Sequence, residues 1–268
     1  MVGGKRIVIL LSTVSVIAFL IFGGTCYVNN YYHATETAEE ALKGTSEVKV
    51  TETKGYYLLE PVEAVDTVGP GETGIIFYPG AKVEETAYVP LLSEFAKCGY
   101  PVYLMRMPAR LAVLDPDAAD TVIYADSKNA ESVEDTEDNA NGVSVTNWIL
   151  MGHSLGGAMA ADYAAGHEDT VSALVLLAAY STKDLTEKDI RVLSIYGSED
   201  SVLNQEKYQK YWDNLPEDTV ECVIDGGNHA GFGYYGDQKG DKQAQISRDE
   251  QQQAVVDAVT YYLQQGAK

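Results

Sequence analysis

The segment Trp148-Ile149-Leu150-Met151-Gly152-His153-Ser154-Leu155-Gly156-Gly157 joins a short apolar run to an alanine-rich stretch through a serine flanked by glycines. This order predicts a strand, a sharp turn and a helix, which is the setting of a G-x-S-x-G nucleophile elbow. The turn needs glycine two residues before and two residues after the serine, because a side chain there would strike the neighbouring strand or helix. We therefore expect Ser154 to stand at the edge of a β-sheet as a nucleophile.

Apolar runs with strand character recur on both sides of this elbow. They cover residues 56–59, 75–78, 102–105, 148–151, 173–177, 192–196 and 220–224. Several are continuously apolar, which is typical of strands covered by helices on both faces. Helical patterns lie between them at residues 86–98, 117–125, 155–166, 204–214 and 248–265, with Ser247 as the expected N-cap of the last. The alternation predicts an α/β fold with a mostly parallel, doubly wound sheet.

Composition limits the classes of function. The 268 residues are 46% hydrophobic, enough for one substantial core, so a single domain over residues 55–268 accounts for the sequence. The formal net charge of -21 opposes binding to nucleic acid or to an anionic lipid surface by charge attraction. Residues 127–144 are acidic and poor in apolar side chains, which predicts a solvated loop.

Neither the cysteines nor the acidic residues indicate a metal or a cofactor, and we expect none. Cys26, Cys98 and Cys222 show no paired spacing, so the sequence favours neither a disulfide framework nor a zinc site. A bridge between Cys98 and Cys222 stays open. Asp237 and Asp241 suggest calcium, but no ligand set completes the spacing.

Residues 1–28 are expected to form a membrane anchor or a signal segment. Lys5 and Arg6 precede an apolar stretch, from Ile7 to Val28, that contains no charged residue. Crossing a bilayer takes roughly 20 residues, and basic residues ahead of the span place the following domain outside the cytoplasm. A cleaved signal peptide, which would give a secreted protein, is less favoured because the stretch is long and no clear A-x-A site follows it. Residues 29–54 are polar and are expected to form a tether.

A serine hydroxyl needs a base to remove its proton and an acid to orient that base. His229 is the candidate base, because it lies in a glycine-rich loop after a strand, at the carboxyl edge where parallel sheets bind ligands. Asp200, which follows the strand at 192–196, is the candidate acid. Glu199 is the alternative, and capping of a helix is the other interpretation of Asp200. Of the remaining histidines, one is in the tether, one in the elbow and one at a helix end: His33, His153 and His167.

The oxyanion that forms during such a reaction needs backbone N–H donors. Leu155, at the start of a helix, is one expected donor, and Ala81 is the other, with Lys82 as the next choice. Lys82, Phe232 and Tyr234 are candidate substrate-binding residues. The two rings would serve equally well to pack over the end of the sheet.

Residues 152–157, 197–200 and 226–231 resemble the motifs of small bacterial α/β-hydrolases, in the compact single-domain group near the dienelactone-hydrolase-like proteins. The resemblance covers roughly residues 56–265 and implies the α/β-hydrolase fold, with Ser154 as nucleophile, Asp200 as acid and His229 as base. Many such proteins carry a cap domain where residues 178–191 lie here, and this segment is too short for one of any size. Dienelactone hydrolase itself uses cysteine, so its substrate does not carry over.

These features do not show which oligomeric state the protein has, but they predict the type of reaction. We expect an extracytoplasmic serine hydrolase that cleaves carboxylic esters, of small molecules or of lipids, through an acyl-enzyme. An acyltransferase acting on envelope or lipid alcohols would use the same site. A catalytically silent, membrane-tethered binding protein is the alternative from another class, because fold alone does not fix function.

Overall fold

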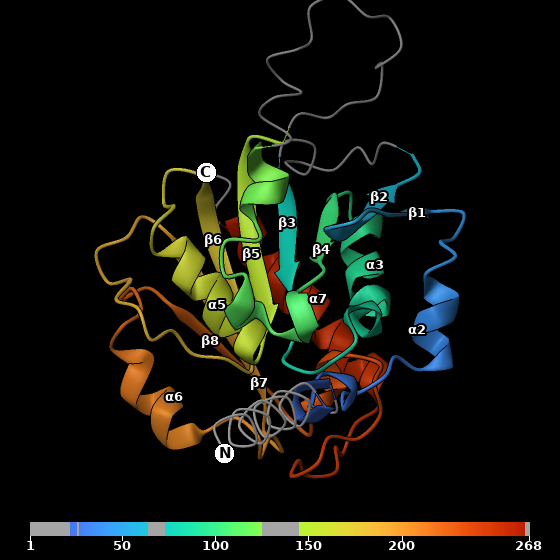
Figure 1. Ribbon diagram of the computed structural model, residues 1–268. Helices are drawn as coiled ribbons and strands as arrows, with labels where there is room; N and C mark the ends of the chain where they lie inside the picture. Colours follow the sequence, from blue (N-terminus) through green and yellow to red (C-terminus); the bar gives the residue numbers. More distant parts are fainter. Residues whose placement is uncertain (1–21, 26, 64–72, 125–144, 266–268) are drawn as a thin grey trace, which may run out of the picture. The chain divides into compact units, whose positions relative to one another are not determined.

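The computed structural model describes residues 22–25, 27–63, 73–124 and 145–265 (Figure 1). The chain divides into two units, Met1–Tyr31 and Tyr32–Lys268. In the first unit, residues 22–25 and 27–29 are helical. Within the described residues, no helix has the length and apolar character needed to cross a membrane. Most of the apolar stretch at residues 7–28, and the acidic loop expected at 127–144, lie outside those residues.

One eight-stranded sheet runs through the second unit, in the order β1-β2-β4-β3-β5-β6-β7-β8. The pairs β1/β2 and β2/β4 are antiparallel, and every other neighbouring pair is parallel. The mostly parallel sheet is thereby confirmed. Its strands are β1 Val48–Glu52, β2 Tyr56–Pro61, β3 Thr73–Tyr78, β4 Val102–Met105, β5 Asn147–His153, β6 Val171–Leu177, β7 Arg191–Gly197 and β8 Val220–Ile224.

Part of the segment expected as a tether, residues 29–54, belongs to the folded unit instead. It holds helix α2 (Glu36–Ala41) and the edge strand β1. On β1 only Val48 is fully buried, and Lys49 pairs across the strands with Glu60. An edge strand with so few buried side chains is mostly polar in sequence, which is why the segment looked like a linker.

Helices cover both faces of the sheet (Figure 1). Helices α3 (Val89–Lys97) and α7 (Arg248–Gln265) share one apolar core with the sheet, and α5 (Leu155–Ala164) packs in the other. Helix α6 (Gln205–Trp212) follows β7. The 3-10 turn η1 (Glu85–Tyr88) precedes α3, and residues 120–124 are helical where a helix was expected from 117. Ser247 caps α7 as predicted, its hydroxyl accepting from the Glu250 N–H at 3.2 Å.

Two further expectations, on a cap domain and on a cysteine bridge, concern residues of the second unit. Residues 178–190 contain no helix and no strand, and β7 begins at Arg191, which confirms that no sizeable cap domain is inserted there. Cys98 and Cys222 are not joined by a disulfide, so the bridge left open by the sequence is not formed.

Candidate active site

The elbow serine lies between β5 and α5 in a backbone conformation that only its surroundings can hold. Ser154 has φ 54° and ψ -124°, in the left-handed half of the map that non-glycine residues avoid. Its N–H donates to the carbonyl of Leu177, at the end of the neighbouring strand β6, at 2.9 Å. The turn is therefore fixed to the carboxyl edge of the sheet.

The two glycines of the motif have the steric role that the sequence predicts. A Cβ on Gly152 would lie 2.6 Å from the Gly157 nitrogen, and a Cβ on Gly156 would lie 2.2 Å from the Tyr78 carbonyl oxygen. Both contacts are with backbone atoms that cannot move aside. The close approach brings the start of α5 against the loop that follows β3.

The candidate acid and base are in direct contact. Oδ2 of Asp200 lies 2.8 Å from Nδ1 of His229, and the two side chains are 0% and 2% exposed. Because a carboxylate only accepts, Nδ1 carries the proton and Nε2 is the nitrogen free to accept one. Oδ1 of Asp200 accepts the N–H groups of Val202 and Leu203 at 2.9 and 2.8 Å, so this residue both caps the following turn and holds the imidazole.

Glu199, the alternative acid, points elsewhere. Its carboxylate accepts from the Gln245 side chain at 2.8 Å and lies 3.7 Å from Nζ of Lys242. Asp200 is thus the carboxylate that the fold delivers to His229. The loop of Asp200 follows β7 and the loop of His229 follows β8, and these two strands are parallel neighbours. The loops lie so close together that a Cβ on Gly197 would be only 2.2 Å from the Gly227 carbonyl.

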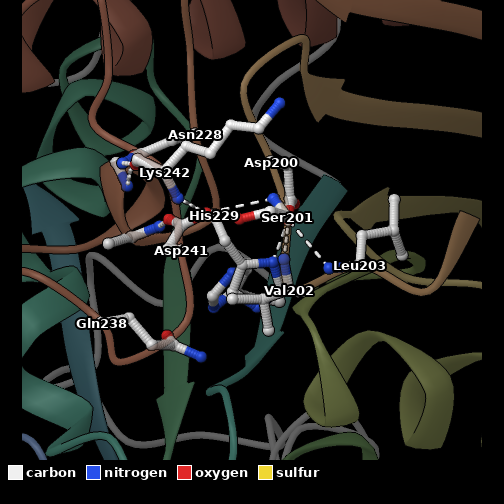
Figure 2. A network of polar contacts seen from close by, with 12 residues as sticks. Asp200, Ser201, Val202, Leu203, Asn228, His229, Gln238, Asp241 and Lys242 are labelled. Atoms are coloured by element: carbon white, nitrogen blue, oxygen red, sulfur yellow. Dashed lines mark hydrogen bonds and ion pairs between the residues drawn. The ribbon is translucent and has the colours of Figure 1, made fainter.

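One residue that the sequence did not single out for this site joins the acid loop to the base loop (Figure 2). Oδ1 of Asp241 accepts the N–H groups of Ser201 and Lys242 at 3.2 and 3.1 Å, and Oδ2 accepts that of Ala230 at 2.9 Å. Ser201 follows the acid and Ala230 follows the base. The carboxylate therefore fixes the loop of Asp200 and the loop of His229 relative to each other.

Gln251 of α7 supports the base loop from the other side. Its side-chain oxygen accepts from the Asn228 N–H at 3.0 Å, and its side-chain nitrogen donates to the Asn228 carbonyl at 2.8 Å. Gln251 is fully buried. Neither Asp241 nor Gln251 has a motif around it, and no sequence signal could have identified either.

The elbow and the base meet through His153. The rings of His153 and His229 have centroids 4.5 Å apart. Nε2 of His229 is buried, and within the described residues it forms no hydrogen bond, with Ser154 or with any other residue. The structure therefore brings Asp200 and His229 together and packs the residue beside Ser154 against the base.

His153 also links the elbow to the loop after β3. The Tyr88 hydroxyl lies 2.8 Å from Nδ1 of His153 and accepts the Gly80 N–H at 3.1 Å. The Tyr88 hydroxyl therefore joins the loop after β3 to the elbow, with one hydrogen bond to Gly80 and one to His153. Burial, together with the nearby His229, holds the pKa of His153 well below its usual value of 6.5.

The loop after β3 distinguishes between Ala81, the expected second oxyanion donor, and Lys82, the next choice. The Lys82 N–H donates to the Arg110 carbonyl at 2.9 Å and is not free to bind an oxyanion. The Ala81 N–H has no acceptor within the described residues. Leu155 is the first residue of α5, where the helix dipole is positive.

The candidate substrate-binding residues have different surroundings. Phe232 is fully buried, with its ring 5.3 Å from that of His153, which favours the packing interpretation. The Tyr234 hydroxyl donates to the Asp249 carboxylate at the start of α7. Lys82 is half-buried, and its φ of 58° is left-handed. No cluster of three or more potential metal ligands occurs among the described residues.

Comparisons with known proteins agree with this architecture. Residues 74–253 match the model of the alpha/beta hydrolase family. Carboxyl esterase 2 from the fungus Tuber melanosporum is similar in structure, with a TM-score of 0.55 and 12% identity over 76% of this chain and 83% of that chain. A predicted CIB-like hydrolase from Thermoplasma acidophilum has a TM-score of 0.51 and 15% identity over 79% of this chain and 96% of that chain. No curated protein sequence matches this one. Since the family model matches more than half of its residues, the chain belongs to the alpha/beta hydrolase family.

Proposed function

We propose that this hydrolase cleaves carboxylic esters through an acyl-enzyme on Ser154. The observation that carries the proposal is the buried contact between Asp200 and His229, placed beside the elbow by the packing of His153 on His229. A buried acid that orients an imidazole has a direct use in activating a hydroxyl. A carboxyl esterase among the structural relatives makes an ester the first substrate class to test.

In the proposed reaction, Nε2 of His229 takes the proton of Ser154 as the serine oxygen attacks the ester carbonyl carbon. The N–H groups of Leu155 and Ala81 stabilise the resulting oxyanion. When the intermediate collapses, His229 returns the proton to the departing alcohol. Water, deprotonated by His229, then attacks the acyl-enzyme and releases the acid. Asp200 stabilises the imidazolium throughout, and the hydrogen bond from serine to histidine tightens once substrate is bound.

We also propose that residues 1–28 hold the domain at the outer face of a membrane. Lys5 and Arg6 before the apolar stretch support this orientation, and the length of the stretch supports an anchor over a cleaved signal peptide.

The test is labelling of the full-length, detergent-solubilised protein with a fluorophosphonate probe, alongside turnover of p-nitrophenyl butyrate. Ser154→Ala should lose both signals, while Ser172→Ala, a half-buried serine on β6, should keep both. Absence of labelling in the parent protein would refute the proposal. Turnover that appears only when glycerol is added as acceptor would identify an acyltransferase instead.

A further inference from the structure

The chain that follows the apolar N-terminal stretch is bound directly to the loop that carries the proposed oxyanion donor. The Tyr32 N–H donates to the Lys82 carbonyl at 2.8 Å, and the Glu84 N–H donates to the Tyr32 carbonyl at 2.8 Å. The Glu84 carboxylate also accepts the Ala34 N–H at 3.0 Å. Tyr32 thus pairs with Val83 as an additional extended segment.

The same few residues are bound to the loop that follows His229. The Thr35 N–H donates to the Tyr234 carbonyl at 2.8 Å, and the Tyr32 hydroxyl accepts the Lys239 N–H at 3.0 Å. The rings of Tyr32 and Tyr235 lie 5.7 Å apart. Residues 32–35, which we call the strap, therefore tie together two of the loops that form the candidate site.

The strap lies very close in sequence to the proposed anchor. Val28 ends the apolar stretch and Tyr32 begins the strap, so four peptide steps separate them. At about 3.5 Å per step, the chain between them spans at most about 14 Å. An anchor that ends at Val28 would keep Tyr32 within that distance of the membrane interface, and with it the loop after β3 to which Tyr32 is bound.

A second observation on the same edge points to lipid. Val113 and Leu114, in the 3-10 turn η3 (Ala112–Leu114), are 52% and 57% exposed. They follow the carboxyl end of β4, and η3 packs on α5, the helix that begins at the elbow. Two adjacent exposed aliphatic side chains on the edge that carries the site are suited to entering the interfacial layer of a bilayer.

We propose that this edge faces the bilayer that holds residues 7–28, and that the substrate is an ester embedded in that bilayer. This inference rests on the proposed function and names its substrate class as lipid esters. The covalent anchor is needed for the approach, because a net charge of -21 opposes attraction to anionic lipid. The strap joins the first residues of the second unit to the loops of the candidate site.

The experiment uses the full chain reconstituted in phosphatidylcholine vesicles and compares two esters. One is 4-methylumbelliferyl oleate dissolved in the bilayer, and the other is water-soluble p-nitrophenyl butyrate. The first variant carries about 20 Gly and Ser residues inserted between Asn29 and Asn30, which adds a typical reach of about 25 Å. The second is Val113→Ser/Leu114→Ser. Its matched control, Val62→Ser/Tyr261→Ser, removes two side chains that are at least as exposed and lie near the opposite edge of the sheet.

We expect the insertion and the Val113→Ser/Leu114→Ser variant each to lower oleate turnover about tenfold and to leave butyrate turnover unchanged. The control should alter neither. Oleate turnover at the parent rate in both variants would overturn the inference, as would a membrane-extracted chain that begins after residue 28 by mass spectrometry. If the parent protein neither hydrolyses butyrate nor is labelled by the fluorophosphonate probe, the proposed function is refuted instead.

Discussion

Replacing Tyr88 by phenylalanine would remove a single oxygen from the interior of the site. The hydroxyl is fully buried, accepts the Gly80 N–H at 3.1 Å and lies 2.8 Å from Nδ1 of His153. The ring can stay in place against Phe77, whose centroid is 4.9 Å away. Tyr88→Phe therefore isolates the loss of the hydroxyl, and it leaves two buried polar groups without a partner.

The size of the effect follows from those two groups. Each buried polar group left unsatisfied costs about 1–3 kcal/mol, so we expect the free energy of unfolding to fall by about 3 kcal/mol. The Gly80 N–H precedes the proposed donor Ala81. Loss of an oxyanion donor lowers kcat by about 10²–10³, and a donor that is merely displaced should lower it by about 10-fold to 100-fold. KM should change little, because the oxyanion forms only after binding.

Urea unfolding followed by circular dichroism gives the first quantity, and steady-state hydrolysis of p-nitrophenyl butyrate gives the second. Tyr57→Phe is the control, since its hydroxyl lies 3.4 Å from the carboxylate of the exposed Glu52 and should contribute about 1 kcal/mol or less. The reasoning is refuted if Tyr88→Phe is no more destabilising than Tyr57→Phe while kcat remains at the parent value.

Three further changes test other parts of the site. Asp241→Asn places an amide NH₂ against a backbone N–H. We therefore expect kcat for p-nitrophenyl butyrate to fall about tenfold and the free energy of unfolding in urea to fall by about 2 kcal/mol. Parental values of both would show that the carboxylate does not hold the loops. Gly156→Ala should cost more than about 3 kcal/mol in the same urea assay, whereas Gly166→Ala, with 3.7 Å of room, should be tolerated; equal stability of the two variants would contradict the steric argument. The pKa of His153 is held below 6.5 in the folded protein, so this histidine takes up a proton in the unfolded chain at a higher pH than in the folded one. The stability that is present above pH 6.5 is therefore lost below it, by up to about 1.4 kcal/mol per pH unit. His153→Asn should flatten that slope below about pH 6.5 in urea titrations, and an unchanged slope would assign it to other groups.

Those parts of the fold that depend on local patterns could be predicted from the sequence. The seven apolar runs correspond to strands β2 to β8, and the central strands β3 to β7 are apolar almost throughout because both of their faces are buried. The contact between Asp200 and His229 was also predictable, because each follows a strand and the carboxyl ends of parallel strands share one edge. Strand β1 was not predicted because it is an edge strand with a single fully buried side chain, so its sequence has no apolar run.

The residues that position the site could not be predicted, and the reason is physical. Asp241 and Gln251 act through hydrogen bonds to backbone groups of loops distant in sequence, and Tyr88 joins the nearby Gly80 to the distant His153. Such contacts impose no spacing and no periodicity on the chain. A lone aspartate in a polar loop looks like a solvated side chain until the loops around it are placed.

These contacts place the candidate catalytic residues in two groups: Asp200 and His229 in one, and Ser154 in the other. The Asp241 carboxylate and Gln251 fix the loops of Asp200 and His229 to each other and to α7, whereas Ser154 belongs to β5 and α5. Between them lies His153, whose ring is 4.5 Å from that of His229 and 5.3 Å from that of Phe232. The variable position of the G-x-S-x-G motif is therefore not free in this chain. A larger or smaller side chain at this position would disturb the packing against His229, because close-packed interiors transmit such changes directly.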